Sequence, residues 1–220
     1  RLIKQVVSMS IADMRRQYSQ GHLTDNDLTD HPADLFKQWL GAAIEAGIPD
    51  PTAMTVATVD ADGQPSQRIV LLKDYDHEGF VFYTNLGSRK AKELSENPRI
   101  SLHFPWFFME RQVRICGTAQ KLTTAQNAKY FLSRPKDSQL AAWASQQSQP
   151  ISSRELLMTQ FHQMKEKFAK KDIPLPDFWG GFKVIPHQIE FWQGGEDRLH
   201  DRFEYTKQAD NRWTTQRLMP

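Results

Sequence analysis

The sequence predicts an α+β protein in which a closed or nearly closed antiparallel β-barrel is wrapped by helices. Between residues 53 and 122, short apolar or alternating segments are separated by turn residues, which is the pattern of such a barrel. Segments with helical spacing lie before and after these strands, within residues 10–46 and 124–170. No internal repeat or low-complexity segment interrupts the 220 residues, so we expect one domain.

The first predicted element is a helical segment over residues 10–46. Leu35, Trp39 and Ile44 recur at helix-compatible spacings, and Gly47 follows as a stop signal.

A β-hairpin comes next. M-T-V-A-T-V-D is its first strand, D-A-D-G its turn and Q-R-I-V-L-L-K-D-Y its returning strand. After the turn D-H-E-G we expect the strand G-F-V-F-Y-T and a polar helix over S-R-K-A-K-E-L-S-E-N. The strands R-I-S-L-H-F-P and E-R-Q-V-R-I-C-G-T-A-Q-K-L complete the barrel core.

The second half of the chain begins with three predicted helices, over residues 124–133, 138–145 and 153–170. A Pro-rich connection, I-P-L-P-D-F-W-G-G-F-K-V, leads into the last strands. The expected single domain, residues 1–220, therefore has four parts: an N-terminal helical segment (1–48), a barrel core (49–123), a second helical segment (124–178) and C-terminal barrel strands (179–220).

Composition excludes several classes of partner. The net charge of +2 is too small to indicate nucleic acid, which argues against a nucleic-acid-binding barrel. No apolar run is long enough to span a bilayer, so we expect no membrane partner. Cys116 is the only cysteine, which excludes an intrachain disulfide and favours the cytoplasm. No Cys/His cluster has zinc-like spacing, and we predict no metal site.

The segment I-E-F-W-Q-G-G-E-D-R-L-H-D-R, residues 189–202, carries the most informative pattern. It predicts a strand, a Gly-Gly turn and a second strand, on which Arg198, His200 and Arg202 would share one face. Such groups repel each other unless an anion lies against them. The alternative is a solvated basic strand whose charge is offset by the neighbouring acidic residues.

The hairpin strand R-I-V-L-L-K carries Arg68 and Lys73 with opposite parity, so in a regular strand they face opposite ways and serve different groups. The alternative is that both are charged strand ends in water.

The segment Y-T-N-L-G-S-R-K places Ser88, Arg89 and Lys90 at the start of a helix, where backbone N–H groups favour a phosphate. The spacing is neither a Walker nor a Rossmann loop, and a capped helix with solvated cations is the alternative.

Tyr130 and Arg134 lie one helical turn apart, and Ser138 starts the next helix. A phenol, a guanidinium and a hydroxyl at such a junction suit a phosphate monoester, although a core Tyr with a capping Arg is an equal alternative.

These segments together resemble the pyridoxine (pyridoxamine) 5'-phosphate oxidase family, FMN enzymes that make pyridoxal 5'-phosphate. The resemblance runs from M-R-R-Q-Y at Met14–Tyr18 to the C-terminal R-L-M-P. The matching blocks are D-P-T-A-M, Q-R-I-V-L-L-K, F-Y-T-N-L-G-S-R-K, R-P-K-D-S-Q, F-W-G-G-F and, most specific of all, E-F-W-Q followed after four residues by R-L-H-D-R.

The resemblance implies a split β-barrel and a homodimer with FMN at the subunit interface. It implies hydride transfer from the substrate's C4' to flavin N5, with O₂ reduced to H₂O₂, in vitamin B6 biosynthesis and salvage. The implied FMN contacts are Arg68, Ile69, Val70, Leu71, Leu72, Lys73, Tyr83, Thr84, Arg89, Lys90, Gln112, Gln147, Ser148, Trp192 and Arg202. The implied substrate contacts are Arg15, Arg16, Tyr18, Lys73, Tyr130, Arg134, Ser138, Arg198, Leu199 and His200.

Within this set, the resemblance assigns catalysis to Arg198 and His200, which would cover the substrate ring, and Arg15 and Tyr18 would form a lid over bound substrate. Two alternatives stay open: a split-barrel flavoprotein that acts on another substrate, and a non-catalytic protein of the same fold that binds flavin or pyridoxal phosphate.

Overall fold

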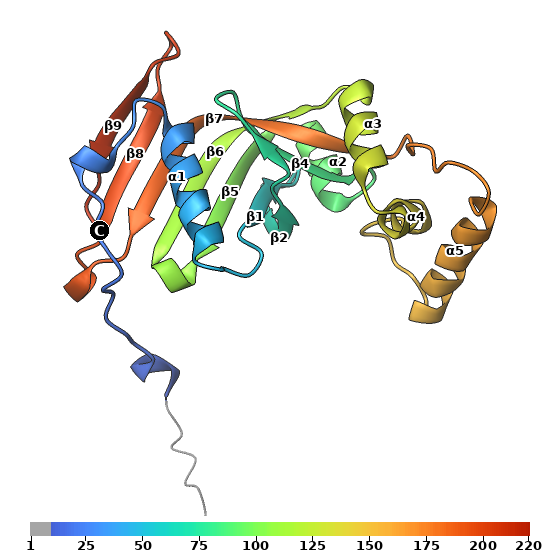
Figure 1. Cartoon of the computed structure of the whole chain (residues 1–220), viewed down its shortest axis with the longest axis horizontal. Coiled ribbons are helices and arrows are strands. Elements are labelled where there is room, and N and C mark those ends of the chain that lie inside the picture. The colour runs from blue at the N-terminus through green and yellow to red at the C-terminus, as the bar shows by residue number, and fades with distance from the viewer. Residues whose placement is uncertain (1–9) are drawn as a thin grey trace, which may run out of the picture.

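The computed structural model describes residues 10–220, in which nine antiparallel strands form one curled sheet with helices around it (Figure 1). The first nine residues of the predicted N-terminal segment lie outside the described residues. The strands are β1 (Ala53–Val59), β2 (Pro65–Leu71), β3 (Asp74–Tyr75), β4 (Phe80–Asn85), β5 (Arg99–Trp106), β6 (Arg111–Lys121), β7 (Trp179–Gln193), β8 (Asp201–Lys207) and β9 (Trp213–Arg217). The α-helices are α1 (Pro32–Glu45), α2 (Arg89–Glu96), α3 (Thr124–Ser133), α4 (Lys136–Ala144) and α5 (Arg154–Lys167). Short 3₁₀ turns are η1 (Ile11–Asp13), η2 (Asp25–Asp27), η3 (Phe107–Met109) and η4 (Glu196–Arg198).

Strand β7 joins the two parts of the split barrel. On one edge it pairs with β6 over nearly its whole length. On the other edge its first part pairs with β4 and its last part with β8. Because a strand rises about 3.3 Å per residue, Trp179 and Trp192 near its two ends lie about 40 Å apart along the strand. The two ends of β7 therefore belong to different regions of the molecule.

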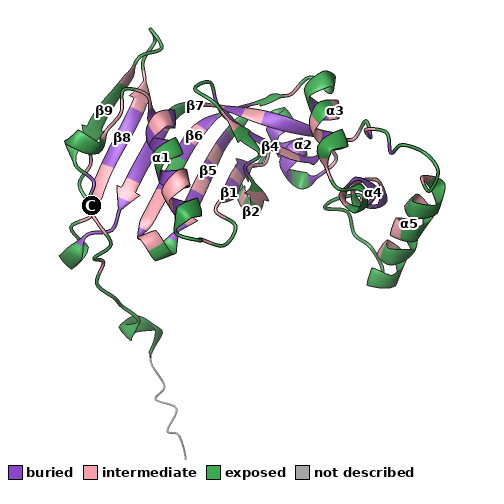
Figure 2. Cartoon of the chain, in the orientation of Figure 1, coloured by how far each residue is buried: buried purple, intermediate pink, exposed green. Residues whose placement is uncertain are grey.

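The main core fills the barrel and is covered by α1. The Phe36 ring of this helix meets Phe80 and Phe104 edge-on, with centroids 5.0 Å away in both cases. A smaller core lies beneath α3 and α4, around Phe131 and Trp179. Figure 2 shows that the central strands of the sheet are largely buried and that α5 is largely exposed. None of the helices within residues 10–220 is long and apolar enough to cross a membrane.

The predicted barrel strands, the polar helix and the three later helices are confirmed, with most ends shifted by up to three residues. The predicted returning strand of the hairpin is divided, because β2 ends at Leu71 and Asp74–Tyr75 form the separate strand β3. The helix predicted over residues 10–46 is wrong, because only Pro32–Glu45 is α-helical. Before it, the backbone N–H groups of Ser19 and Gln20 donate to the side chain of Glu110 in the barrel, so they form no helical bonds.

The predicted strand face of Arg198, His200 and Arg202 is also wrong. Asp197 and Arg198 adopt left-handed φ angles of 53° and 64° and form the turn η4, and β8 begins only at Asp201. Left-handed backbone ends a strand, since it reverses the chain direction locally. Of the three residues, only Arg202 lies on a strand.

Candidate functional site

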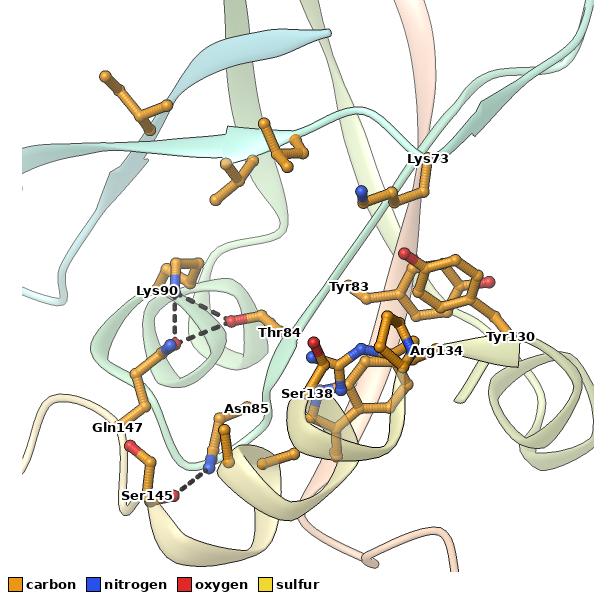
Figure 3. A pocket seen from close by; sticks show the side chains of 17 residues that line it. Lys73, Tyr83, Thr84, Asn85, Lys90, Tyr130, Arg134, Ser138, Ser145 and Gln147 are labelled. Carbon is orange, nitrogen blue, oxygen red and sulfur yellow. Dashed lines mark hydrogen bonds between the residues drawn. The ribbon is translucent and has the colours of Figure 1, made fainter. Parts of the chain in front are cut away.

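A cavity of 610 Å³ opens between β2, β4, α3 and α4 (Figure 3). Many of the predicted ligand residues line it: Ile69, Val70, Leu71, Lys73, Tyr83, Thr84, Lys90, Tyr130, Arg134, Ser138 and Gln147. These residues come from two strands, three helices and the loops between elements. The fold therefore gathers side chains that are up to 78 positions apart in the chain (69 to 147).

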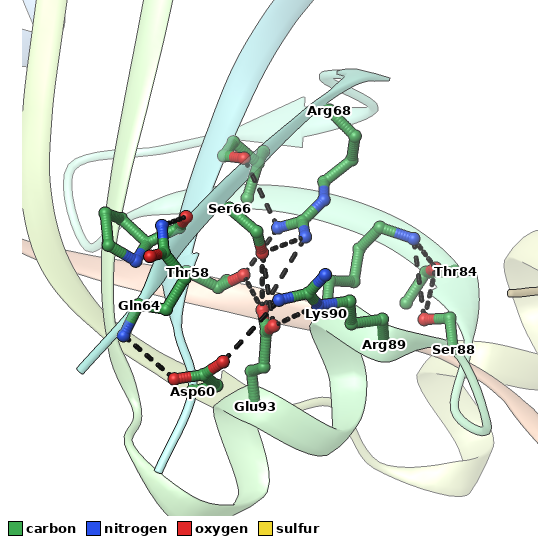
Figure 4. Close-up of polar contacts among 12 residues, drawn as sticks. Thr58, Asp60, Gln64, Ser66, Arg68, Thr84, Ser88, Arg89, Lys90 and Glu93 are labelled. Atoms are coloured by element: carbon green, nitrogen blue, oxygen red, sulfur yellow. Dashed lines mark hydrogen bonds and ion pairs between the residues drawn. The ribbon is translucent and has the colours of Figure 1, made fainter. Parts of the chain in front are cut away.

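One end of the cavity is built around Lys90. Its ammonium group donates to Thr84 Oγ1 at 2.9 Å, to Gln147 Oε1 at 2.8 Å and to Ser88 Oγ at 3.4 Å (Figure 3; Figure 4). All three acceptors are neutral, and the side chain is buried. Burial, helped by the charge of Arg68, lowers the pKa of Lys90 to about 8. A buried ammonium group without a carboxylate is stabilised by an anionic ligand.

The other end has an aromatic wall and a second cation. The rings of Tyr83 and Tyr130 stack with centroids 4.0 Å apart, and Tyr83 also stacks on Trp179 at 5.2 Å. The guanidinium of Arg134 lies 4.9 Å from the centre of the Trp179 ring, and its buried Nη1 has no hydrogen-bond partner. Lys73 extends toward this end (Figure 3). A buried guanidinium nitrogen without an acceptor marks a second position for an anion.

Behind the cavity, Glu93 organises a polar network (Figure 4). Its carboxylate accepts hydrogen bonds from Thr58, Ser66 and Arg89, and it lies 3.6 Å from Arg68. Burial alone would raise the pKa of Glu93, but these hydrogen bonds and the charge of Arg68 lower the pKa to about 2. Glu93 is therefore ionised and holds both arginines.

The two arginines do not line the cavity, although both were predicted FMN contacts. Arg68 points toward Glu93, whereas Lys73 lines the cavity, so the two residues serve different groups as predicted. Strand parity is not the reason, because β2 ends at Leu71 and Lys73 lies beyond it. Arg89 pairs with Glu93 one helical turn away. Leu72, another predicted contact, is buried in the barrel core.

A second group of predicted residues lies at the far end of β7. The His200 ring lies 4.6 Å from that of Trp192 and 5.5 Å from that of Tyr18. Beside these rings is an open cavity of 850 Å³ whose lining includes Arg15, Arg16, Tyr18 and Arg198. Leu199 is 72% exposed.

The imidazole of His200 is held in one tautomer. Its Nδ1 accepts a hydrogen bond from the Gly195 N–H at 3.1 Å. Burial and the charges of Arg198 and Arg202 lower the pKa of His200. Near neutral pH the ring is therefore uncharged and carries its hydrogen on Nε2.

Arg202 is already paired in this chain. Its Nε donates to Glu190 at 2.9 Å and its Nη1 to the carbonyl of Met219 at 2.8 Å. The second carboxylate oxygen of Glu190 accepts from Arg114 at 2.5 Å. The hydrogen bond to Glu190 raises the pKa of Arg202.

Gln112 lies apart from both groups. It lines a groove of 320 Å³ on the sheet, and its Oε1 contacts Nε2 of His103 at 2.8 Å. Ser148 follows Gln147 in a loop with a left-handed φ of 69° and is not among the cavity residues.

One chain thus brings the predicted phosphate ligands together but separates them from Arg198 and His200 by the length of β7. Several residues in and around the cavity were not predicted, of which Trp179 and Glu93 matter most for its shape and charge. Trp179 forms part of the cavity wall, and the block F-W-G-G-F was its signal. Glu93 holds Arg68 and Arg89. Its position four residues after Arg89 could have predicted the ion pair with that residue.

The curled sheet and the cation-lined cavity define a split β-barrel protein with an anion-binding site. The sequence profile described as pyridoxamine 5'-phosphate oxidase matches residues 40–168. Residues 179–220 match the profile of the pyridoxine 5'-phosphate oxidase C-terminal dimerisation region. The chain belongs to the pyridoxamine 5'-phosphate oxidase family.

Relatives and solved structures agree with this family. The chain is 72% identical to a pyridoxine/pyridoxamine 5'-phosphate oxidase of Alteromonas mediterranea, over 96% of this chain and 100% of the relative. It is 61% identical to one from Vibrio parahaemolyticus, with the same coverage. PhzG from Burkholderia lata, solved in complex with tetrahydrophenazine-1-carboxylic acid, superposes with a TM-score of 0.85 and 32% identity, over 90% of this chain and 98% of that chain. A pyridoxamine 5'-phosphate oxidase-related, FMN binding protein from Nostoc punctiforme shares the fold, with a TM-score of 0.70, 14% identity and coverage of 84% and 97%.

Proposed function

We propose that this protein is an FMN-dependent oxidase that converts pyridoxine 5'-phosphate or pyridoxamine 5'-phosphate to pyridoxal 5'-phosphate in the cytoplasm. The observation that carries the proposal is that the buried Lys90 and the half-buried Arg134, whose Nη1 is buried, line one cavity, where no carboxylate within residues 10–220 pairs with either. A flavin phosphate and a substrate phosphate would satisfy one each.

When bound, FMN would supply the electron acceptor for the hydride that leaves the substrate's C4', with O₂ as the final oxidant and H₂O₂ as its product. On this proposal Lys90 holds the FMN phosphate, with Thr84 and Gln147 around it. Glu93 keeps Arg68 and Arg89 charged nearby, which adds a positive potential at this end of the cavity.

The substrate phosphate is assigned to the opposite end of the cavity. Arg134 has a free buried donor there, and Lys73, Tyr130 and Ser138 line the same end. These groups fix the position of the phosphate and thereby the position of the ring attached to it, and such orientation supplies much of an enzyme's rate enhancement.

We propose that each complete site is shared by two copies of the chain in a homodimer. Arg198 and His200 lie at the far end of β7, about 40 Å along the strand from the cavity, which is too far for one small substrate to contact both groups. The matched dimerisation region, residues 179–220, contains both residues. One copy would supply the phosphate ligands, and its partner would supply Arg198, His200, Trp192 and Arg202 across the interface.

In this arrangement Arg198 and His200 cover the substrate ring. The neutral His200 presents Nε2–H as a donor, because Nδ1 is occupied by the Gly195 N–H. Arg198 supplies a fixed positive charge that stabilises negative charge on ring substituents. Arg15 and Tyr18, beside this end, would close over bound substrate.

A different substrate is the main enzymatic alternative, because PhzG holds an unphosphorylated tricyclic carboxylic acid in its structure. The set formed by Lys73, Tyr130, Arg134 and Ser138 favours a phosphorylated substrate here, since a buried guanidinium would stay unsatisfied without an anion.

The test is an oxidase assay on the FMN-loaded protein. We expect pyridoxine 5'-phosphate to yield pyridoxal 5'-phosphate and H₂O₂ in equal amounts, with far less turnover of unphosphorylated pyridoxine. Bound FMN without peroxide formation would identify a non-catalytic binding protein and contradict the proposal.

A further inference from the structure

Glu110 has no part in the site described so far, yet it is the most heavily engaged carboxylate at the far end of β7. It follows η3 in a left-handed conformation with φ of 54°, and it is 2% exposed. Its carboxylate accepts hydrogen bonds from Arg16 Nη1 at 2.7 Å and from the backbone N–H groups of Ser19 at 2.7 Å and Gln20 at 2.9 Å.

All three donors belong to one short segment, residues 16–20, and no other donor to this carboxylate is found within residues 10–220. A buried carboxylate without hydrogen bonds is strongly unfavourable. If the segment left the barrel, Glu110 would lose all these partners. Its charge therefore holds the segment in place.

The segment carries Tyr18 between its anchored ends. A Cβ atom on Gly194 would lie only 2.9 Å from Cγ of Tyr18, so the ring packs directly on this glycine. The same ring meets His200 edge-on at 5.5 Å. The Gly194 N–H in turn donates to the carbonyl of Glu110 at 2.7 Å. Glu110 thus fixes both surfaces of the contact, through its side chain and through its backbone.

We propose that Glu110 is a positioning residue for the oxidase. Its carboxylate holds residues 16–20 so that Tyr18 lies against His200 and Arg15 lines the cavity that Arg198 also lines, where the substrate ring is proposed to bind. The proposal rests on the proposed function for its kinetic consequence, but the anchoring itself is a property of the protein without substrate.

Limited trypsin digestion of the FMN-loaded protein tests the anchoring. In Glu110→Gln the amide presents N–H groups to donors, so we expect cleavage after Arg15 and Arg16 to be at least about tenfold faster than in the wild type, as for loss of a charged hydrogen bond. Cleavage at Lys165 and Lys167 in α5 should not change, which separates local release from global unfolding. Glu45→Gln, the same change at an exposed glutamate at the end of α1, is the matched control, since it lies away from all of these cleavage sites.

Steady-state kinetics test the positioning. The apparent substrate affinity falls in proportion to the population of the closed segment, so KM for pyridoxine 5'-phosphate should rise in Glu110→Gln, by about tenfold when the segment is closed a tenth of the time. The kcat value should stay within about twofold, because bound substrate restores the closed segment. The dissociation constant of FMN should not change, whereas a loss of general structure would alter FMN binding and kcat together.

Gly194→Ala provides a second variant in case Glu110→Gln fails to fold. Its added Cβ would lie 2.9 Å from Cγ of Tyr18 and 3.0 Å from Cβ of Glu110. It therefore displaces the Tyr18 ring and presses on the Glu110 side chain but keeps the charge of its carboxylate, so KM should rise without a change in FMN binding. The proposal is overturned if both soluble variants keep the wild-type KM, or if Glu110→Gln keeps the wild-type trypsin resistance. If the wild-type protein has no oxidase activity, the proposed function fails, and the digestion still decides the anchoring.

Discussion

The cationic side chains near the two ends of strand β7 differ in whether a carboxylate pairs with them. At the Trp179 end, Lys90 has only neutral hydrogen-bond partners and Arg134 has a buried nitrogen with none. At the Trp192 end, Arg202 is satisfied by Glu190 and a backbone carbonyl. The first end is prepared for anions, whereas the second is stable without them. On the proposed function, one chain contributes phosphate ligands from the first end and ring-covering residues from the second.

The largest expected effect comes from Arg198 at the Trp192 end. We expect Arg198→Ala to lower kcat by about 10²–10³-fold, as for removal of one preorganised donor at a reacting centre. FMN affinity, measured by flavin fluorescence, should change far less. Arg212→Ala removes an exposed arginine that pairs only with Asp210 and serves as the control. An unchanged steady-state rate in Arg198→Ala would remove this residue from catalysis.

The next effect concerns Lys90 at the Trp179 end. Lys90→Met removes the charge and keeps the length of the side chain, so FMN affinity should fall by about a hundredfold, the value of a charge-assisted hydrogen bond in a buried site. Equilibrium titration with FMN measures this loss. The control is Lys92→Met, an exposed change on the same helix α2, and equal FMN affinity of the two variants would contradict the assignment.

The lowered pKa of Lys90 predicts a pH dependence of FMN binding. Below pH 8 the lysine is charged and binds a phosphate, and above pH 8 the protein without FMN must first take up a proton. FMN affinity should therefore be nearly constant from pH 7 to 8 and fall by up to about tenfold per pH unit above it. Titrations at several pH values check this, and Lys90→Met should lack the decline. A wild-type affinity that rises above pH 8 would contradict the assigned charge.

The smallest effect is expected at Arg114. This arginine shares Glu190 with Arg202, but its side chain is 48% exposed. A partly exposed ion pair contributes about 0–1 kcal/mol, so Arg114→Val should change FMN affinity by less than about fivefold. A loss as large as that of Lys90→Met would show that Arg114 belongs to the binding site.

The cavity could be predicted from sequence because its ligands sit in local patterns. Tyr130 and Arg134 are one helical turn apart and both line the cavity, and Arg68 and Lys73 serve different groups as predicted. The family resemblance extended these patterns to the whole chain.

The far end of β7 could not be predicted in the same way. The period-two spacing of Arg198, His200 and Arg202 suggested a strand. In the structure Asp197 and Arg198 have left-handed backbone conformations within a turn, which side-chain spacing does not predict. Glu110 binds Ser19 from 91 residues away, so no local pattern connects them. This long-range contact uses backbone N–H groups of residues 19 and 20, which the helix expected before Pro32 would have used for its own hydrogen bonds.

The central claim is that each site combines the cavity of one chain with Arg198 and His200 of another. Mixed dimers of Arg134→Ala and Arg198→Ala test it directly, after both inactive variants are unfolded together and reassembled in equal amounts. Half of the dimers should be mixed, and each should hold one intact site in its two-fold arrangement, so oxidase activity should return to about a quarter of the wild-type value. Reassembly that yields mixed dimers without any recovered activity would contradict the claim and place the complete site within a single chain.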